Sequence, residues 1–204
     1  MSAVARVAVL HLRTVAPYKA QGLMVFALLV AVLSRNPVGL VPALALLLTP
    51  LIAVHPFVVA DKAGLGTLYA VLPLSRRTVV LGHYAWALGS FLATVAAGTA
   101  PALLLARGEG APLDGRTLVT LLTVSWALFA VNIAIQLPLL IRFGYARSSV
   151  LGTNMPVALI MLAVYRLHLS LSSVQVWLPL LWAAGAAAVA TSAALTSRTP
   201  GARA

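Results

Sequence analysis

Long apolar runs, interrupted by charged residues almost only at their ends, are the feature of this sequence that most restricts its fold. Of the 204 residues, 62% are hydrophobic and 8% are charged, and the mean hydropathy is +1.03. Soluble globular domains have about half apolar and about a quarter charged residues. Because a chain in lipid must satisfy its backbone hydrogen bonds internally, such runs favour helices. The sequence therefore predicts an all-α integral membrane protein.

The number of apolar runs predicts the number of helices. A helix that crosses a bilayer needs about 20 apolar residues. Six segments approach this length, and we expect one transmembrane domain over residues 1–204 with six membrane-spanning helices. The predicted spans are residues 15–33, 38–60, 79–106, 118–141, 150–165 and 174–195.

The basic residues predict how the chain is oriented. Cytoplasmic loops retain Lys and Arg. If both termini are cytoplasmic, ten of the 14 basic residues lie inside: Arg6, Arg13, Lys19, Lys62, Arg76, Arg77, Arg142, Arg147, Arg198 and Arg203. The outer segments then hold Arg35, Arg107, Arg116 and Arg166. Because the charges are placed between spans and form no patch, they indicate topology and give no support for nucleic-acid binding.

The segment before the first span has the pattern of an amphipathic helix. Val4, Val7, Ala8 and His11 recur at helical spacing, with Arg6 and Arg13 between them. Such a helix can lie on the inner leaflet with its apolar face in the lipid. The alternative is a frayed basic tail.

Several kinds of chemistry lack the residues that they need. The chain has no cysteine, and it has no glycine-rich loop ending in Lys-Ser/Thr to hold nucleotide phosphates. No His and acidic residues have the spacing of a helical metal site. We therefore predict no enzymatic activity, no metal and no cofactor on this chain. If ATP drives the protein, the ATPase is another polypeptide.

Polar residues near or within the spans are further candidates. His55 and His83 flank the loop that begins at Asp61, where they could take part in proton transfer or pack at the interface. Prolines at positions 42, 50 and 56 predict a kink in the second span. Asn132, Gln136 and Asn154 could face a translocation route or a subunit seam, or could bond between helices.

The loop between the second and third predicted spans can form a short surface helix and a turn. Gly64 and Gly66 interrupt its apolar residues, so another span is not expected there. Pro73 disfavours helical geometry at Leu72. Ser75 can then cap the next helix by accepting a hydrogen bond from a backbone amide two or three residues later.

Two loop motifs resemble those of permease subunits of type 2 ATP-binding cassette exporters, the group of drug, lantibiotic and peptide exporters. The first is "FVVADKAGLGTLYAVLPLSRRTVVLGHY", and the second is "LPLLIRFGYARSSVL". The chain departs from the family pattern at Ala60-Asp61-Lys62, where Asp-Glu-Lys is typical, and at Ala146-Arg147, where Glu-Lys is typical.

The resemblance implies partners and site residues. A separate cassette ATPase, carrying ATP and Mg, would dock on a coupling loop that includes Asp61, Lys62, Leu72, Pro73, Ser75, Arg76 and Arg77. A second cytoplasmic loop would include Arg142, Phe143, Gly144, Tyr145 and Arg147. Two permease subunits, identical or different, would pair in a bacterial cytoplasmic membrane.

The expected function is therefore that of the membrane subunit of an ATP-driven exporter. Spans rich in Leu, Val and Ala favour a hydrophobic or amphipathic substrate, such as a peptide, antibiotic or drug. One alternative is a non-transport immunity or sensor scaffold, which the low charge of the loops favours. Another is a membrane-embedded enzyme of lipid metabolism that would use His55 and His83.

Overall fold

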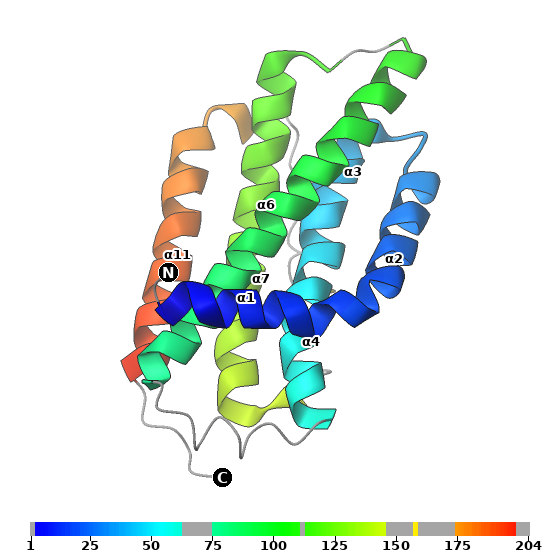
Figure 1. Cartoon of the computed structure of the whole chain (residues 1–204). Helices are drawn as coiled ribbons and strands as arrows, with labels where there is room; N and C mark the ends of the chain where they lie inside the picture. Colours follow the sequence, from blue (N-terminus) through cyan, green and yellow to red (C-terminus); the bar gives the residue numbers. More distant parts are fainter. Residues whose placement is uncertain (1–2, 63–74, 111–112, 146–156, 159–173, 199–204) are drawn as a thin grey trace.

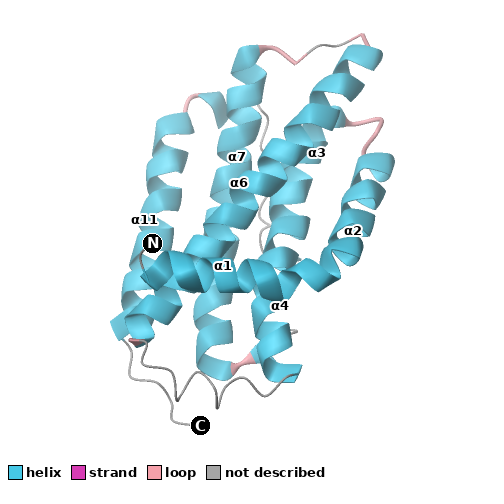
Figure 2. Ribbon diagram, viewed as in Figure 1, coloured by secondary structure: helices cyan, strands magenta, loops and turns pink. Residues whose placement is uncertain are grey.

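The protein is a bundle of helices that run side by side, with one helix lying across them. The computed structural model describes residues 3–62, 75–110, 113–145, 157–158 and 174–198. Every regular element in these residues is helical (Figure 2), as the sequence predicted. In Figure 1 the N-terminal helix crosses the lengthwise helices below their middle.

Nine helical segments make up this bundle in the described part of the chain. Their bounds are α1 Ala3–Val15, η1 Ala16–Tyr18, α2 Lys19–Val32, α3 Pro37–Ala43, η2 Leu44–Leu48, α4 Thr49–Lys62, α6 Arg76–Gly108, α7 Gly115–Phe143 and α11 Leu178–Arg198. The segment η1 is a 3₁₀-helix, and η2 is a π-helix.

The described residues contain four helices that are long and apolar enough to cross a membrane. They are Pro37–Lys62, Arg76–Gly108, Gly115–Phe143 and Leu178–Arg198. A fifth span results if α1 and α2, which meet at a bend of 80°, are counted as one broken span. The protein is thus a multi-pass membrane protein. The predicted span 150–165 lies outside the described residues except for Val157 and Ala158, so the six-span prediction stays a prediction.

The predicted first span, residues 15–33, starts at a bend between α1 and α2. Val15 is the last residue of α1, and α2 begins at Lys19 after the 3₁₀ turn η1. The turn contains Pro17, whose ring has no N–H to donate and clashes with the preceding helical turn. The apolar pattern continues through this position, so hydropathy alone did not locate the bend.

Prolines also interrupt the regular pattern of the second span, whose predicted kink stays a prediction. Pro42 lies inside α3, Pro56 lies inside α4, and the π-helix η2 lies between them. Pro50 has no amide to donate to the carbonyl four residues earlier, so the regular α-helical pattern is interrupted here. The hydroxyl of Thr49, which is fully buried, donates to the carbonyl of Leu44 over 3.3 Å.

Side-chain caps fix where the long helices begin. Ser75 accepts a hydrogen bond of 3.2 Å from the amide of Thr78, which confirms the predicted cap of α6. Asp114 caps α7 by accepting a hydrogen bond of 3.1 Å from the amide of Thr117. Hydrogen bonds from the Thr117 side chain and amide hold the pKa of the exposed Asp114 carboxyl below its usual value.

The apolar core lies where α7 packs against α3, η2 and α6. Phe129 of α7 is fully buried, and its ring stacks on Phe91 of α6 with centroids 4.5 Å apart. Leu40, Leu44 and Leu137 fill the space around this pair at 0% exposure. Burying a Leu or Phe side chain stabilises a fold by roughly 1.5–3 kcal/mol where water is the alternative. Within a membrane the same contacts act mainly through close packing.

Indole rings and hydroxyls attach α11 to α7. Trp126 stacks on Trp182 with ring centroids 5.1 Å apart. Its indole N–H also donates a hydrogen bond of 3.3 Å to the backbone carbonyl of Trp182. The indole N–H of Trp182 in turn donates a hydrogen bond of 3.0 Å to the hydroxyl of Thr123. The hydroxyl of Ser192 donates a hydrogen bond of 2.8 Å to the carbonyl of Ala134. It also lies 2.6 Å from the hydroxyl of Tyr84, and this second contact connects α11 to α6.

We expect Gly185→Ala to weaken the contact between α7 and α11. A Cβ at Gly185 would lie 2.6 Å from Nε1 of Trp126 and 3.2 Å from Cβ of Ala130, and the indole is held by its hydrogen bond. Overpacking of this kind costs about 1–3 kcal/mol. The apparent melting temperature, followed by size-exclusion recovery after heating in detergent, should fall by several degrees.

Gly89→Ala is the matched control, because Gly89 lies in α6 and nothing is within 4 Å of its added Cβ. Alanine is a better helix former than glycine, so this variant should be unchanged or slightly more stable. Equal melting temperatures for the two variants would contradict the proposed tight contact at Gly185.

Candidate functional site

One end of the bundle gathers five basic residues at the ends of long helices. Figure 1 shows that α4, α7 and α11 finish at this end and that α6 begins there. The basic side chains of these helix ends are Lys62, Arg76, Arg77, Arg142 and Arg198. The opposite end carries Arg35, Arg107 and Arg116 together with the acids Glu109 and Asp114. We call the first of these the basic end.

The two loop motifs identified in the sequence meet at the basic end. Gly144, just after α7, has φ 74° and ψ 169°, a conformation that is essentially restricted to glycine. A Cβ built on Gly144 would lie 3.9 Å from Oδ1 of Asp61, near the end of α4. The tertiary structure thus places the acidic residue of the first motif beside the Phe-Gly-Tyr of the second.

The other candidate loop residues fall into two groups. The exposed residues flanking the first loop are Asp61, Lys62, Ser75, Arg76 and Arg77, while Leu72 and Pro73 lie outside the described residues. In the second loop Arg142 and Phe143 are exposed, with the guanidinium 5.4 Å from the ring centroid, and Tyr145 is half-buried. Arg147 lies outside the described residues, as does Asn154 of the candidate route.

Asn132 and Gln136 form a buried polar pair on α7. Both are 0% exposed, and within the described part of the chain neither amide nitrogen nor amide oxygen has a hydrogen-bond partner. The predicted alternative, bonding between helices, is therefore not seen among these residues. Leaving a buried polar group unpaired costs about 1–3 kcal/mol. If the pair served only to pack the helices, it would therefore destabilise the fold.

His83 lies in a stack of three rings that joins three helices. Its imidazole lies 4.4 Å from that of His11 on α1 and 4.3 Å from the ring of Phe57 on α4, each with an interplanar angle of 21°. His55 is half-buried and lines a separate cavity of about 620 Å³ with Gln21, between α2, α4 and α6. The sequence pattern suggested His55 as the partner of His83, whereas the described contact is with His11.

The same contacts hold α1 across the bundle. Val7 and His11 are 5% and 1% exposed, and Val7 packs on Gly82 of α6, where any side chain would collide with it. Arg6 and Arg13 are exposed, as are Leu10 and Leu12. A helix therefore forms where the sequence predicted an amphipathic one, and the frayed-tail alternative is wrong for Ala3–Val15.

The described residues offer few groups for catalysis or metal binding. No group of three His, Asp or Glu side chains that could hold a metal ion occurs among them. The buried histidines stack face to face, with both His11 nitrogens lacking a hydrogen-bond partner in the described part. The geometry is that of a helix junction, and the polar chemistry is concentrated at the basic end.

A comparison with known protein families distinguishes between the functions considered for this chain. A family model described as "ABC-2 family transporter protein" matches residues 13–196, which is most of the chain. The chain belongs to the ABC-2 transporter family. No curated protein matches it, and no solved structure matches it.

Membership of the ABC-2 family makes this chain a transport permease. The ABC-2 chain is the transmembrane component of such transporters, and the ATPase is a separate component. The resemblance inferred from the two loop motifs is thereby confirmed. The match spans α2, nearly all of the four long helices and both motif loops, so Asp61, Gly144, Asn132 and Gln136 lie within the part of the chain that matches the family.

We expect His11→Ala to loosen α1 from the bundle. The change removes the imidazole that lies between α1 and His83, and buried aromatic contacts contribute about 0.5–1.5 kcal/mol beyond their burial. Hydrogen–deuterium exchange of the α1 amides should become roughly tenfold faster or more.

Leu12→Ala is the control, since Leu12 neighbours His11 on α1 but is 57% exposed. Its α1 amides should exchange at the wild-type rate. If both variants or neither variant accelerated exchange, the ring stack would not be what holds α1.

Proposed function

We propose that this protein is the permease subunit of an ATP-driven exporter of hydrophobic or amphipathic molecules in a bacterial cytoplasmic membrane. Two permease subunits pair with ATPase subunits that bind ATP and Mg, and both chain termini are cytoplasmic. The observation that carries the proposal is the meeting of both loop motifs at the basic end of an ABC-2 permease. The positive-inside rule assigns this end to the cytoplasm.

The basic end supplies a surface on which the ATPase would act. Asp61 lies near the end of α4 and Arg76 begins α6, so force applied to the intervening loop reaches two long helices directly. The position of Gly144 beside Asp61 makes the end of α7 part of the same surface. Closure of the ATPase dimer would thus shift α4, α6 and α7 together and change which side of the membrane the permease opens to.

Asn132 and Gln136 mark the proposed translocation route. Unpaired buried amides raise the energy of the described conformation, and a conformation in which they meet water or a polar group of the substrate would be favoured in comparison. The remainder of the long helices is mainly apolar, which supports a hydrophobic or amphipathic substrate. This pair gives such a substrate a few polar contacts within an apolar path.

Charge reversal at the basic end should release the ATPase. We expect the variant Asp61→Arg, Arg76→Glu, Arg77→Glu to lose the cassette ATPase in a pull-down from detergent-solubilised native membranes, because complementary charges become repulsive. Wild type should retain it.

A matched control reverses the same charges at the opposite end: Glu109→Arg, Arg107→Glu, Arg116→Glu. This variant changes net charge equally and should retain the ATPase. Recovery of no ATPase with wild type would argue against an exporter and would revive the immunity or sensor scaffold. Equal losses for both variants would contradict the placement of the coupling surface.

Replacing the buried amides should separate stability from transport. We expect Asn132→Leu with Gln136→Met to raise the melting temperature, since two unpaired polar groups leave the apolar interior. The same variant should lower the substrate-stimulated ATPase activity of the reconstituted transporter, because the polar contacts of the route are gone.

Ser125→Ala provides the control on the same helix. Ser125 is fully buried, but its hydroxyl donates 2.7 Å to the carbonyl of Leu121. We expect its transport to stay at the wild-type level. A fall in melting temperature for the amide variant would show that the amides are paired in the assembled transporter, and unchanged stimulation would remove them from the route.

A further inference from the structure

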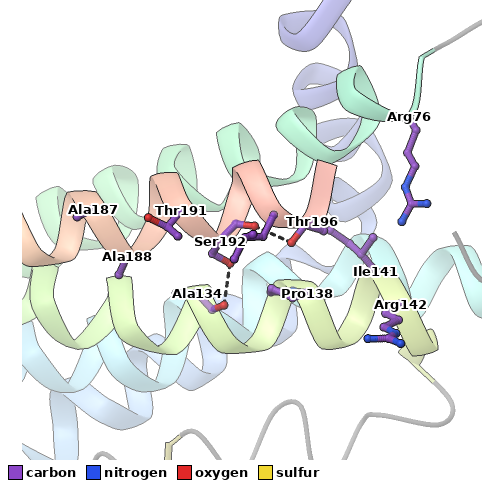
Figure 3. A pocket seen from close by; sticks show the side chains of 11 residues that line it. Arg76, Ala134, Pro138, Ile141, Arg142, Ala187, Ala188, Thr191, Ser192 and Thr196 are labelled. Atoms are coloured by element: carbon purple, nitrogen blue, oxygen red, sulfur yellow. Dashed lines mark hydrogen bonds between the residues drawn. The ribbon is translucent and has the colours of Figure 1, made fainter. Parts of the chain in front are cut away.

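A groove opens along α7 and α11 and finishes at the basic end. Its volume is about 550 Å³, and Figure 3 shows Ala134 and Pro138 on the α7 side with Ala187 and Thr191 on the α11 side. Arg76 and Arg142 line one end of the groove, from the start of α6 and the last turn of α7. The groove has an apolar body and two cationic groups at one end.

Two of the hydroxyls in the groove wall, those of Ser192 and Thr196, already form hydrogen bonds. Ser192 donates to the carbonyl of Ala134, and Thr196 donates 2.7 Å to the carbonyl of Ser192. Apart from the hydroxyl of Thr191, the wall therefore presents mainly alkyl groups, many of them from alanines. A ligand in this part of the groove would bind mainly by burying hydrocarbon that fits its shape, and polar groups on the ligand would add little affinity.

Few acidic residues lie at the end of the bundle that holds the two guanidinium groups. The chain has three acidic residues, and two of them, Glu109 and Asp114, lie at the opposite end. Asp61 is the single acidic side chain at the basic end, which also holds Lys62, Arg77 and Arg198. Arginine pairs well with phosphate because its planar fork of donors matches the phosphate oxygens. The charges favour an anionic occupant.

The length of the groove matches one leaflet. From Ala187 to Thr196 a helix rises about 13 Å at 1.5 Å per residue. Half of a bilayer hydrocarbon core is about 15 Å. A chain lying along α11 from Arg76 and Arg142 would reach close to the membrane midplane. Basic pockets between membrane helices on the cytoplasmic side are known to hold anionic lipid headgroups.

We propose that this groove binds an anionic phospholipid, with one acyl chain between α7 and α11 and the phosphate held by Arg76 and Arg142. The site is separate from the buried amides of α7. Since Arg76 also begins the helix that follows the proposed coupling loop, the bound lipid would influence how that loop is held. Binding itself requires neither transport nor ATP.

The headgroup can be tested by native mass spectrometry of the full-length chain, with any co-purifying ATPase retained. The probes are phosphatidylglycerol and phosphatidylcholine with identical acyl chains. We expect wild type to prefer phosphatidylglycerol and Arg76→Gln with Arg142→Gln to bind it roughly 20- to 30-fold more weakly. Arg107→Gln with Arg116→Gln, which removes equal charge at the opposite end, should bind as wild type does.

The acyl chain is tested by filling the groove. Ala187 and Ala186 are neighbouring exposed residues of α11, and only Ala187 lines the groove. Ala187→Leu should weaken binding of phosphatidylglycerol, and Ala186→Leu should leave it unchanged. An excess of inorganic phosphate should not displace the lipid, because phosphate lacks the chain.

Several results would overturn the lipid site. Equal binding of the two lipids by wild type, or equal losses for both arginine pairs, would show that charge at this groove does not select the lipid. Displacement by inorganic phosphate alone would indicate a simple anion site. Arg76→Lys with Arg142→Lys keeps both charges without the planar fork, so it should bind phosphatidylglycerol more tightly than the glutamine variant and less tightly than wild type. Binding no tighter than that of the glutamine variant would contradict a role for charge at this groove. None of these outcomes depends on ATPase recovery, so they are distinguishable from a failure of the exporter proposal.

Discussion

The pairing of backbone polar groups inside each helix is the constraint on which this structure depends. In lipid there is no water to bond a free amide or carbonyl, so each span must close its own hydrogen bonds. The structure departs from this at prolines and compensates nearby. Pro17 is placed in a turn where the chain changes direction, and the prolines of the second span accompany a π-helical segment. Ser75 and Asp114 supply oxygens for the first amides of α6 and α7.

Side-chain polar groups follow the same rule with two exceptions in the described residues, the stacked histidines and the amide pair of α7. Indoles and hydroxyls between α7 and α11 are bonded to carbonyls or to each other, and they attach the two helices together with the stacked Trp126 and Trp182 rings. Asn132 and Gln136 on the opposite flank of the core helix have no such partners in the described residues. A permease must alternate between conformations, so polar groups that are poorly satisfied in one of them are expected where the path opens.

The basic end is the surface on which both proposed contacts, with the ATPase and with lipid, would be made. All four long helices have one end there, and Gly144 brings the end of α7 to Asp61 through a backbone conformation that other residues avoid. The same arginines are available to a partner protein and to lipid phosphate. A lipid held at Arg76 and Arg142 would therefore lie next to the surface on which the ATPase is proposed to act.

Hydropathy and the placement of charge in the sequence were sufficient to predict an all-helical multi-pass protein, the amphipathic α1 and the Ser75 cap, because these depend on residues within one turn or one span. The two loop motifs were sufficient to identify the permease family. The bend between α1 and α2 was not predicted because Pro17 acts on backbone geometry, which hydropathy does not measure. The stack of His11, His83 and Phe57, the approach of Asp61 to Gly144 and the groove ending at Arg76 and Arg142 were decided only by the tertiary structure. Each joins residues far apart in the chain, and their meeting depends on which helix faces pack together, which no local pattern specifies.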